Sequence, residues 1–256
     1  MPPSLAGFDT GLFLPRGGYD WFGRPSYPPR LLLLAGGALH IVSHPSAGEP
    51  PRQCAMEQVS SVESGHMLLK GWLRFTGSGF DYTVRYNTRG FPTVFRFMRR
   101  FQDKLLPRST PRGASEVRLG PSLDIKFANA LALELGSEET VLIQLFQPPG
   151  QVRSGSCLLR HRRWVAGDLL ALTGRRLLWI TDRERGSYWR YASIASYAPL
   201  DAVQSIGLAS GRAGHILRVE LNGGCAWQVP IASGSREEWQ RIAEDFAAAA
   251  SMVRTS

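Results

Sequence analysis

The sequence predicts a mainly β protein with some α structure, organised as two bent antiparallel β-barrels that are each capped by a C-terminal amphipathic helix. Three observations support this fold class. Short apolar runs occur in pairs around glycine turns, as β-hairpins require. The apolar spacing then changes from every second residue to every third or fourth residue, which marks a helix. The whole series occurs twice within the 256 residues.

The first half begins with a predicted hairpin over residues 30–44, RLLLLAGGALHIVSH, in which two apolar runs meet at Gly36-Gly37. Next, the stretch QVSSVESGHMLLKGWLRFTGSGFDYTVRY predicts strands that turn at Ser64-Gly65 and again at residues 77–79. Glycine and serine favour turns, and the flanking apolar residues favour strands. We therefore expect consecutive antiparallel strands over residues 30–87.

The segment FPTVFRFMRRFQDKLL then predicts a helix, with Pro92 in its first turn, where the missing N–H costs nothing. One face is apolar and contains Val94, Phe97, Met98, Phe101 and Leu105. The other face is basic and contains Arg96, Arg99, Arg100 and Lys104. Because the apolar face is needed to close the preceding barrel, only the basic face is left for a surface contact.

The middle of the chain is less regular. Residues 106–121 have the proline, glycine and serine content of a linker. Residues 122–136 predict a helix capped by Ser122, with an apolar stripe of Leu123, Phe127, Leu131 and Leu135. Residues 139–147 predict a strand, and residues 148–167 a loop around a short apolar piece.

The second half repeats the series. The stretch DLLALTGRRLLWITD (168–182) predicts a hairpin that bends at Gly174, and further turns follow at residues 211–214 and at Asn222-Gly223. SREEWQRIAEDFAAAASMV predicts the closing helix, with a Ser235–Glu238 capping box. An offset of 145 aligns its apolar positions with those of the first helix, which indicates an internal duplication. The aligned apolar residues of the second helix are Trp239, Ile242, Ala243 and Phe246.

Several antiparallel strands followed by one helix, in tandem, resemble the pleckstrin-homology-like (PH-like) superfold. GDLLALTGRRLLWITD looks like the hairpin of bacterial PH domains, in which an lxlTxxRLl pattern follows a segment similar to LELGSEETVLIQLF. The first half departs from that pattern, because AGGALHIV lacks the threonine and arginine. The resemblance implies a first domain over residues 1–106 with an N-terminal extension, a linker and connecting helix over 107–137, and a second domain over 138–256.

The same resemblance implies a non-catalytic binding module, and it directs attention to the arginines of the second hairpin. Basic residues there grip headgroup phosphates in lipid-binding PH domains, because guanidinium makes bidentate charge-assisted hydrogen bonds. An anion or headgroup site would contain Arg175, Arg176, Arg183 and Arg190, with Arg162 and Arg163 at its rim. The alternative is that these arginines only make a soluble turn.

Composition limits the other classes of function. The formal net charge of +9 suits an anionic partner without requiring one. Cys54, Cys157 and Cys225 are far apart, which favours free thiols over a disulfide framework or a zinc site. No signal peptide or membrane-spanning segment is expected, because the longest apolar stretch is too short. We find no nucleotide-binding, zinc-protease or hydrolase motif, so no catalytic residue, metal or cofactor is expected.

The sequence therefore predicts a cytoplasmic binding or scaffold protein that recruits to, or bridges, an anionic membrane surface at its inner face or a protein assembly. One alternative is a purely protein–protein module, acting as a homo-oligomer or a complex subunit without binding lipid. An enzyme whose cleft the sequence does not reveal is an alternative of another class. Nucleic acid is not an expected partner, because no contiguous basic stripe or aromatic platform occurs.

Overall fold

A computed structural model of the chain describes residues 8–19, 25–44, 48–67, 70–106, 117–119, 121–136, 139–154, 161–182, 193–211, 214–230 and 236–255. Within them the protein is mainly β, with three α-helices and several mostly antiparallel sheets, which confirms the coarse fold class. None of the sheets formed by the described strands closes on itself.

We call residues 8–106 the first unit and residues 139–255 the second unit. The first unit contains β1 (Thr10–Leu14), β2 (Gly17–Tyr19), β3 (Pro25–Tyr27), β4 (Arg30–Ala35), β5 (Ala38–Ser43), β6 (Arg52–Ala55), β7 (Val59–Met67), β8 (Lys70–Gly77), β9 (Phe80–Asn87) and α1 (Phe91–Leu105). The second unit contains β11 (Val141–Gln147), β12 (Gly150–Ser154), β13 (His161–Val165), β14 (Asp168–Thr173), β15 (Arg176–Thr181), β16 (Ser193–Pro199), β17 (Val203–Gly211), β18 (Gly214–Leu221), β19 (Cys225–Pro230) and α3 (Arg236–Thr255). Between the units lie β10 (Val117–Leu119) and α2 (Ile125–Glu134).

The two units have the same order of elements. In each, four main strands pair side by side, a small two-stranded hairpin is inserted after the first of them, and three further strands and a helix follow. A short 3₁₀ turn precedes the fifth main strand in both units, at Met56–Gln58 and at Leu200–Ala202. The register shifts just after both turns, between Val59 and Ser61 and between Val203 and Ser205. This correspondence of detail supports the predicted duplication.

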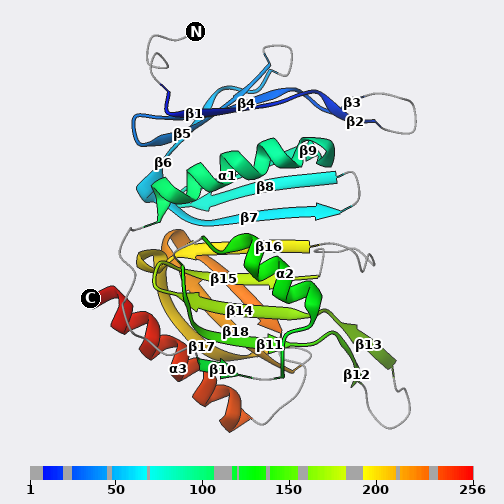
Figure 1. Cartoon of the computed structure of the whole chain (residues 1–256), viewed down its shortest axis with the longest axis vertical. Coiled ribbons are helices and arrows are strands. Elements are labelled where there is room, and N and C mark those ends of the chain that lie inside the picture. The colour runs from blue at the N-terminus through cyan, green and yellow to red at the C-terminus, as the bar shows by residue number, and fades with distance from the viewer. Residues whose placement is uncertain are drawn as a thin grey trace.

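The units share one sheet of eight strands, in the order β10-β11-β14-β15-β16-β7-β8-β9 (Figure 1). They join where β16 of the second unit pairs with β7 of the first, with Ser193 opposite His66 and Tyr197 opposite Val62. We call this strand pair the seam. The predicted domain boundaries thus separate strands that are hydrogen-bonded in a single sheet.

Both faces of the second-unit part of this sheet are covered. Successive side chains of a strand point to opposite faces, so Leu169 and Ala171 of β14 join one core cluster while Leu170 and Leu172 join another. The first cluster contains residues of α1, α2 and the strands of the first unit, and the second contains residues of β17–β19 and α3. The two coverings explain why β11 and β14 are apolar almost without interruption.

The helix predictions are largely confirmed. Helix α1 buries Val94, Phe97, Met98 and Phe101, and Pro92 lies in its first turn. The aligned residues of α3, Trp239, Ile242, Ala243 and Phe246, are buried as well. Helix α2 is capped by Asp124, whose carboxylate accepts the Phe127 N–H at 2.9 Å, and not by Ser122. The Ser235–Glu238 capping box lies outside the described residues and side chains.

One turn prediction and one loop prediction are wrong. Strand β7 continues through Ser64-Gly65 and pairs with β8 as far as Met67, opposite Lys70. Gly65 is required there by close packing, because a Cβ atom would lie 2.1 Å from the Trp72 ring. The expected loop over residues 148–167 contains the β12–β13 hairpin. The turns predicted at residues 36–37, 77–79 and 222–223 are confirmed, and Gly211 pairs with Gly214 at the ends of the turn predicted between β17 and β18.

Candidate functional site

The described part of the predicted arginine site is the hairpin of β14 and β15, which closes over Gly174 and Arg175. Arg176 follows on β15, and its side chain is only 1% exposed. Its Nε and Nη2 atoms donate to the two carboxylate oxygens of Glu139, at 2.9 and 2.7 Å. Nη2 also donates to the backbone carbonyl of Glu134, at 2.6 Å. The guanidinium of Arg176 is thus buried and hydrogen-bonded inside the protein. It does not reach a headgroup at the surface, which corrects its assignment to the anion site.

Glu139 and Thr173 complete this buried group, which we call the hairpin clamp (Thr173, Arg176 and Glu139). The Thr173 hydroxyl donates to Glu139 at 2.7 Å and accepts the Arg175 and Arg176 N–H groups at 3.2 and 3.1 Å. Burial by itself raises the pKa of Glu139, but the hydrogen bonds from Arg176 hold it below its ordinary value. The clamp fixes the start of β11 and the end of α2 to the second hairpin.

Arg175 is half-buried, and its Nη2 atom donates to the backbone carbonyl of Leu106 at 3.3 Å. It therefore ties the hairpin to the end of the first unit. Arg162 and Arg163 lie on β13, opposite Arg153 and Val152, but their side chains are outside the described part of the structure. Arg183 and Arg190 also lie outside the described residues. The described side chains thus form an internal brace and not a convergent surface site.

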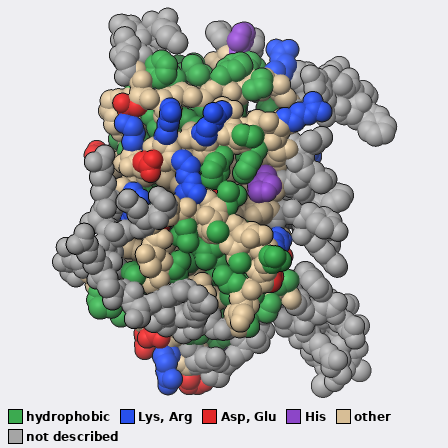
Figure 2. All heavy atoms as spheres, viewed as in Figure 1, with side chains coloured by type: hydrophobic (Ala, Val, Ile, Leu, Met, Phe, Trp, Pro, Cys, Tyr) green, Lys and Arg blue, Asp and Glu red, His purple; other side chains and the backbone are tan. Residues whose placement is uncertain are grey.

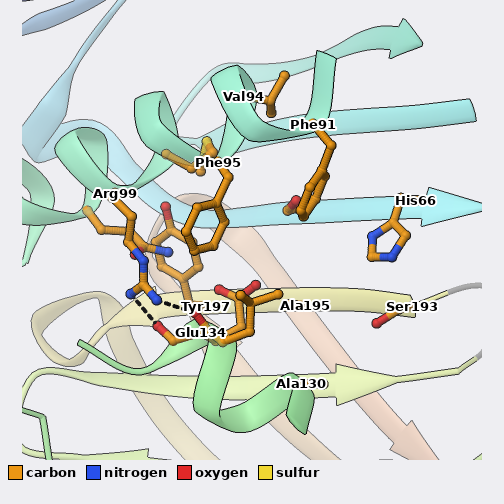
Figure 3. A pocket seen from close by; sticks show the side chains of 14 residues that line it. His66, Phe91, Val94, Phe95, Arg99, Ala130, Glu134, Ser193, Ala195 and Tyr197 are labelled. Carbon is orange, nitrogen blue, oxygen red and sulfur yellow. Dashed lines mark hydrogen bonds between the residues drawn. The ribbon is translucent and has the colours of Figure 1, made fainter. Parts of the chain in front are cut away.

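A pocket that the sequence did not single out lies over the seam, between α1 and α2 (Figure 3). We call it the seam pocket. Its volume is about 40 Å³, room for on the order of three water molecules. Its floor is formed by Ser64 and His66 of β7 and by Ser193, Ala195 and Tyr197 of β16. Its walls come from Phe91, Val94, Phe95, Met98, Arg99 and Gln102 of α1 and from Ala130, Leu133 and Glu134 of α2.

Aromatic rings line the α1 wall. The rings of Phe91 and Phe95 are half-buried and lie 6.0 Å apart, and the His66 ring lies 5.3 Å from that of Phe91. The guanidinium of Arg99 lies 4.9 Å from the centre of the Phe95 ring. Because Phe91, Phe95 and Arg99 are spaced by four residues, they form one stripe beside the buried face of α1. Opposite them, Leu133 is 43% exposed.

Arg99 also holds the two helices together. Its guanidinium donates to the carbonyl oxygens of Glu134 at 2.7 Å and Leu135 at 3.0 Å, and to that of Leu133. The last carbonyls of a helix have no partner within the helix and carry partial negative charge, so a cation there is favourable. Arg99 was assigned to the free basic face of the first helix, but it turns toward α2.

The inner part of the pocket is polar. Tyr197 is 1% exposed, and Gln102 of α1, which also lines the pocket, is buried as well. The guanidinium of Arg176 lies 5.2 Å from the centre of the Tyr197 ring. Burial raises the pKa of Glu134, against the opposing effect of Arg176 and Arg99. The seam pocket is therefore apolar at its mouth and polar at its base.

The pocket contains side chains of types that can serve in catalysis. Ser64, Ser193 and His66 line the pocket, but no hydrogen bond joins a serine to the histidine among the described side chains. Burial lowers the pKa of His66, which leaves a neutral imidazole at neutral pH. Among the described residues, no group of three His, Cys, Asp or Glu side chains could hold a metal ion. Cys54 and Cys225 are free, and Cys157 lies outside the described residues.

Helix α1 also carries basic side chains that do not line the pocket. In Figure 2 lysine and arginine side chains gather over α1, next to a hydrophobic patch. Arg96 and Arg100 are exposed there, and Arg100 donates to the Thr10 hydroxyl at 3.1 Å. Lys104 is paired with Asp9 at 2.7 Å. Arg100 and Lys104 are thus bonded on the β1 side of α1. We call the pocket with its walls of Phe91, Phe95 and Leu133 the seam groove.

No model of a known protein family matches the chain, and no curated protein matches its sequence.

One sequence signal did point to this groove. Phe91 and Phe95 lie four residues apart and outside the buried stripe of α1, and an aromatic pair without a core position marks a second contact surface. The other wall had no such signal, since only the pairing of β16 with β7 brings α2 beside α1.

Proposed function

We propose that the chain is a non-catalytic binding or scaffold protein, and that it binds a protein partner through the seam groove. The observation that carries this proposal is a half-buried aromatic stripe, Phe91 and Phe95, that faces the exposed Leu133 across the pocket between α1 and α2. Concave apolar surfaces rimmed by polar residues mark interaction sites more often than scattered exposed residues do. The groove lies where the units meet, so a bound partner would contact both.

The tandem PH-like architecture is part of the proposal. In its favour, each unit has four main strands, three further strands and a closing helix, in that order. The resemblance favours an adaptor over an enzyme, although a fold does not determine a function. Cytoplasmic location belongs to the same proposal. No helix among the described residues has the length and apolar content needed to cross a bilayer.

Recruitment to an anionic membrane surface is the second candidate, and the basic side chains of α1 favour it. The second hairpin gives it less support, because Arg176 is buried and Arg175 is bonded to Leu106. A membrane would have to use Arg96 and Arg100, and a flat bilayer does not reach into a pocket sunk between two helices.

A pair of matched variants tests the proposal. Leu133 and Ile125 are both exposed apolar residues of α2, but only Leu133 lines the seam pocket. We expect Leu133→Glu to abolish most capture of partner proteins by the full chain from extracts, and Ile125→Glu to leave it unchanged. Equal capture by both variants would contradict a role for the groove.

Co-sedimentation with vesicles separates the membrane candidate. The proposal predicts little binding of the wild type to vesicles that contain anionic lipid, at 50 or 150 mM salt. Strong binding to anionic but not neutral vesicles, lost in Arg175→Ala or Arg96→Gln, would favour membrane recruitment instead, since exposed charges are screened by salt.

A further inference from the structure

One face of the sheet β1-β4-β5 in the first unit lies outside both core clusters. Successive residues of a strand point to opposite faces, so Leu32 of β4 joins the first core cluster while Leu31 points outward. Phe13 of β1 lies opposite Leu31, and Val42 of β5 lies opposite it on the other side. These three residues form an apolar row across the strands, which we call the outer row. It belongs to the end of the molecule that is uppermost in Figure 1.

The second unit contains an equivalent row. Strands β4 and β14 each have six residues, and Leu31 and Leu169 are the second residues in them. Leu169 lies opposite Phe146 of β11 on one side and opposite Ile180 of β15 on the other. The two rows thus have phenylalanine, leucine and a β-branched residue in the same order.

The row of the second unit is covered by α2. Phe146 is 3% exposed, and its ring lies 5.1 Å from that of Phe127 on α2. Phe13 has the same place in the first unit but is 63% exposed, and Leu31 and Val42 are only half-buried. Helix α1 corresponds to α3, so none of the described helices is the counterpart of α2 in the first unit. The outer row is therefore a prepared surface that lacks its helix.

The manner in which α2 covers the second unit shows what fits on the outer row. Phe127 and Leu131 of α2 are buried and lie one turn apart, whereas Lys126 and Asn129 are exposed. A row across three neighbouring strands is about 10 Å long, because adjacent strands lie about 4.8 Å apart. Two turns of a helix span about the same length. An amphipathic helix with apolar residues four positions apart would thus cover the exposed ring of Phe13.

The two faces differ where the end of α2 is fixed. Arg176 is the first residue of β15, and it donates to the backbone carbonyl of Glu134 at the end of α2. Ala38 is the first residue of β5 and has no side-chain donor. A helix on the outer row would lack this brace and would depend on its apolar contacts. Such a helix can come from a separate molecule that binds reversibly.

A second copy of this chain is a poor source of the helix. Its α2 already covers the second unit, where Phe127 is 1% exposed. The apolar faces of α1 and α3 are also buried within their own units, including Phe101 and Phe246, each 0% exposed. The described helices of a second copy thus offer no free apolar stripe.

From these observations we infer that the outer row binds an amphipathic helix of another protein, whose apolar residues contact Phe13, Leu31 and Val42. None of these three residues lines the seam pocket. The inference therefore goes beyond the proposed function and does not depend on it.

Two displayed peptide libraries test the inference, with the full chain as the bait. The first fixes phenylalanine at i and leucine at i+4 and i+8, which gives one helical stripe, and randomises the other positions among Glu, Lys, Gln and Ala. The second fixes the same residues at i, i+2 and i+4, which gives no helical stripe. We expect enrichment from the first library alone. Synthetic versions of the selected peptides should bind at least tenfold more weakly to Phe13→Glu and about threefold more weakly to Phe13→Ala.

Two control variants separate the outer row from other apolar surfaces. Ile125→Glu changes an apolar residue of α2 that is 79% exposed, and Leu133→Glu changes the seam groove. Both should bind the selected peptides as the wild type does. Because Phe13 is exposed, both of its variants should unfold at the same temperature as the wild type, which a thermal scan checks.

Four results would overturn the inference. The first is no enrichment from the helical library, or enrichment of the alternating library in its place. The second is equal binding of the selected peptides by the wild type and Phe13→Glu. The third is binding that Leu133→Glu abolishes and Phe13→Glu retains, which would assign the peptides to the seam groove. The fourth is a wild type that sediments as a dimer and a Phe13→Glu variant that is monomeric, which would make a second copy the occupant.

Discussion

The two units close equivalent hairpins by different means. The β4–β5 hairpin ends in Gly36 and Gly37, which have φ angles of 56° and 72° and no atom near the place of a Cβ. The β14–β15 hairpin ends in Gly174 and Arg175 and is held by the hairpin clamp. The first turn combines left-handed glycine conformations with a backbone hydrogen bond from Met56 to the Gly37 carbonyl. The second is held by buried side-chain contacts with residues more than 30 positions away. Similar sequence patterns thus produce a local turn in one unit and a tertiary brace in the other.

The difference matters for function because arginines at a hairpin are readily interpreted as ligand-binding residues. In the second unit one of them is an internal partner of Glu139 and of the α2 carbonyl end. The brace holds α2 over the sheet, and α2 forms one wall of the seam groove. On this account Arg176 supports the binding surface without contacting what binds there.

The largest expected effect is the loss of Arg176. Arg176→Met leaves the Glu139 carboxylate buried without its cation, and breaking such a pair costs about 3–5 kcal/mol. Urea unfolding of the full chain measures this loss. The control is Arg218→Met, which removes an exposed arginine paired with Glu220 and should cost about 1 kcal/mol or less. Similar losses in the two variants would contradict the clamp.

Removal of the Thr173 hydroxyl should have the next largest effect. Thr173→Val keeps the size of this fully buried side chain but leaves the Arg175 and Arg176 N–H groups and Glu139 each short of a partner. We expect a loss of about 1–3 kcal/mol in the free energy of unfolding. Thr83→Val, on the exposed side of β9, should change it little. A neutral Thr173→Val would mean that the turn does not depend on the hydroxyl.

In the first hairpin the sensitive feature is conformation. Gly37→Ala places a Cβ in open space but at a positive φ, which costs about 1–2 kcal/mol in an L-residue. Gly90→Ala is the matched control, because Gly90 also has open space but a φ of −82°. Thermal unfolding of the two variants should separate them. If Gly37→Ala were as stable as Gly90→Ala, the turn would not require its glycine.

The smallest expected effect concerns the pH dependence of stability near the hairpin clamp. The Glu134 carboxyl lies beside the clamp, and burial raises its pKa above the ordinary 4.5, so the fold disfavours its ionised form. This cost is absent below the ordinary pKa and grows as the pH rises through it. Glu134→Gln should therefore be slightly more stable than the wild type at pH 7 and equally stable near pH 4. Denaturant unfolding at both pH values would reveal the opposite trend if the ionised form were favoured.

Local patterns allowed much of the fold to be predicted. The hairpin at Gly36-Gly37 and the buried stripe of α1 follow from turn chemistry and from helical spacing, which involve residues close in sequence. The pairing of Ser193 with His66 has no local signature, because it joins strands 127 positions apart. The seam pocket depends on that pairing and was missed with it.

The candidate site was predicted less well for the same reason. Arg176 belongs to a basic pair in the sequence, and only its contact with Glu139, 37 positions earlier, makes it internal. Arg99 looks like part of a free basic face until α2 places its last carbonyls opposite. The charge of a residue can be deduced from the sequence, whereas its partner depends on the tertiary fold.

A double-mutant cycle between Arg176 and Glu139 tests most directly whether the second hairpin is a brace. Arg176→Met, Glu139→Leu and the double variant are unfolded in urea and compared with the wild type. The account predicts that the double variant is more stable than the sum of the single losses by about 2 kcal/mol or more, because both buried charges are removed together. If the sum of the two single losses equals the loss in the double variant to within about 0.5 kcal/mol, the two residues are not coupled. Arg176 would then again be a candidate ligand contact.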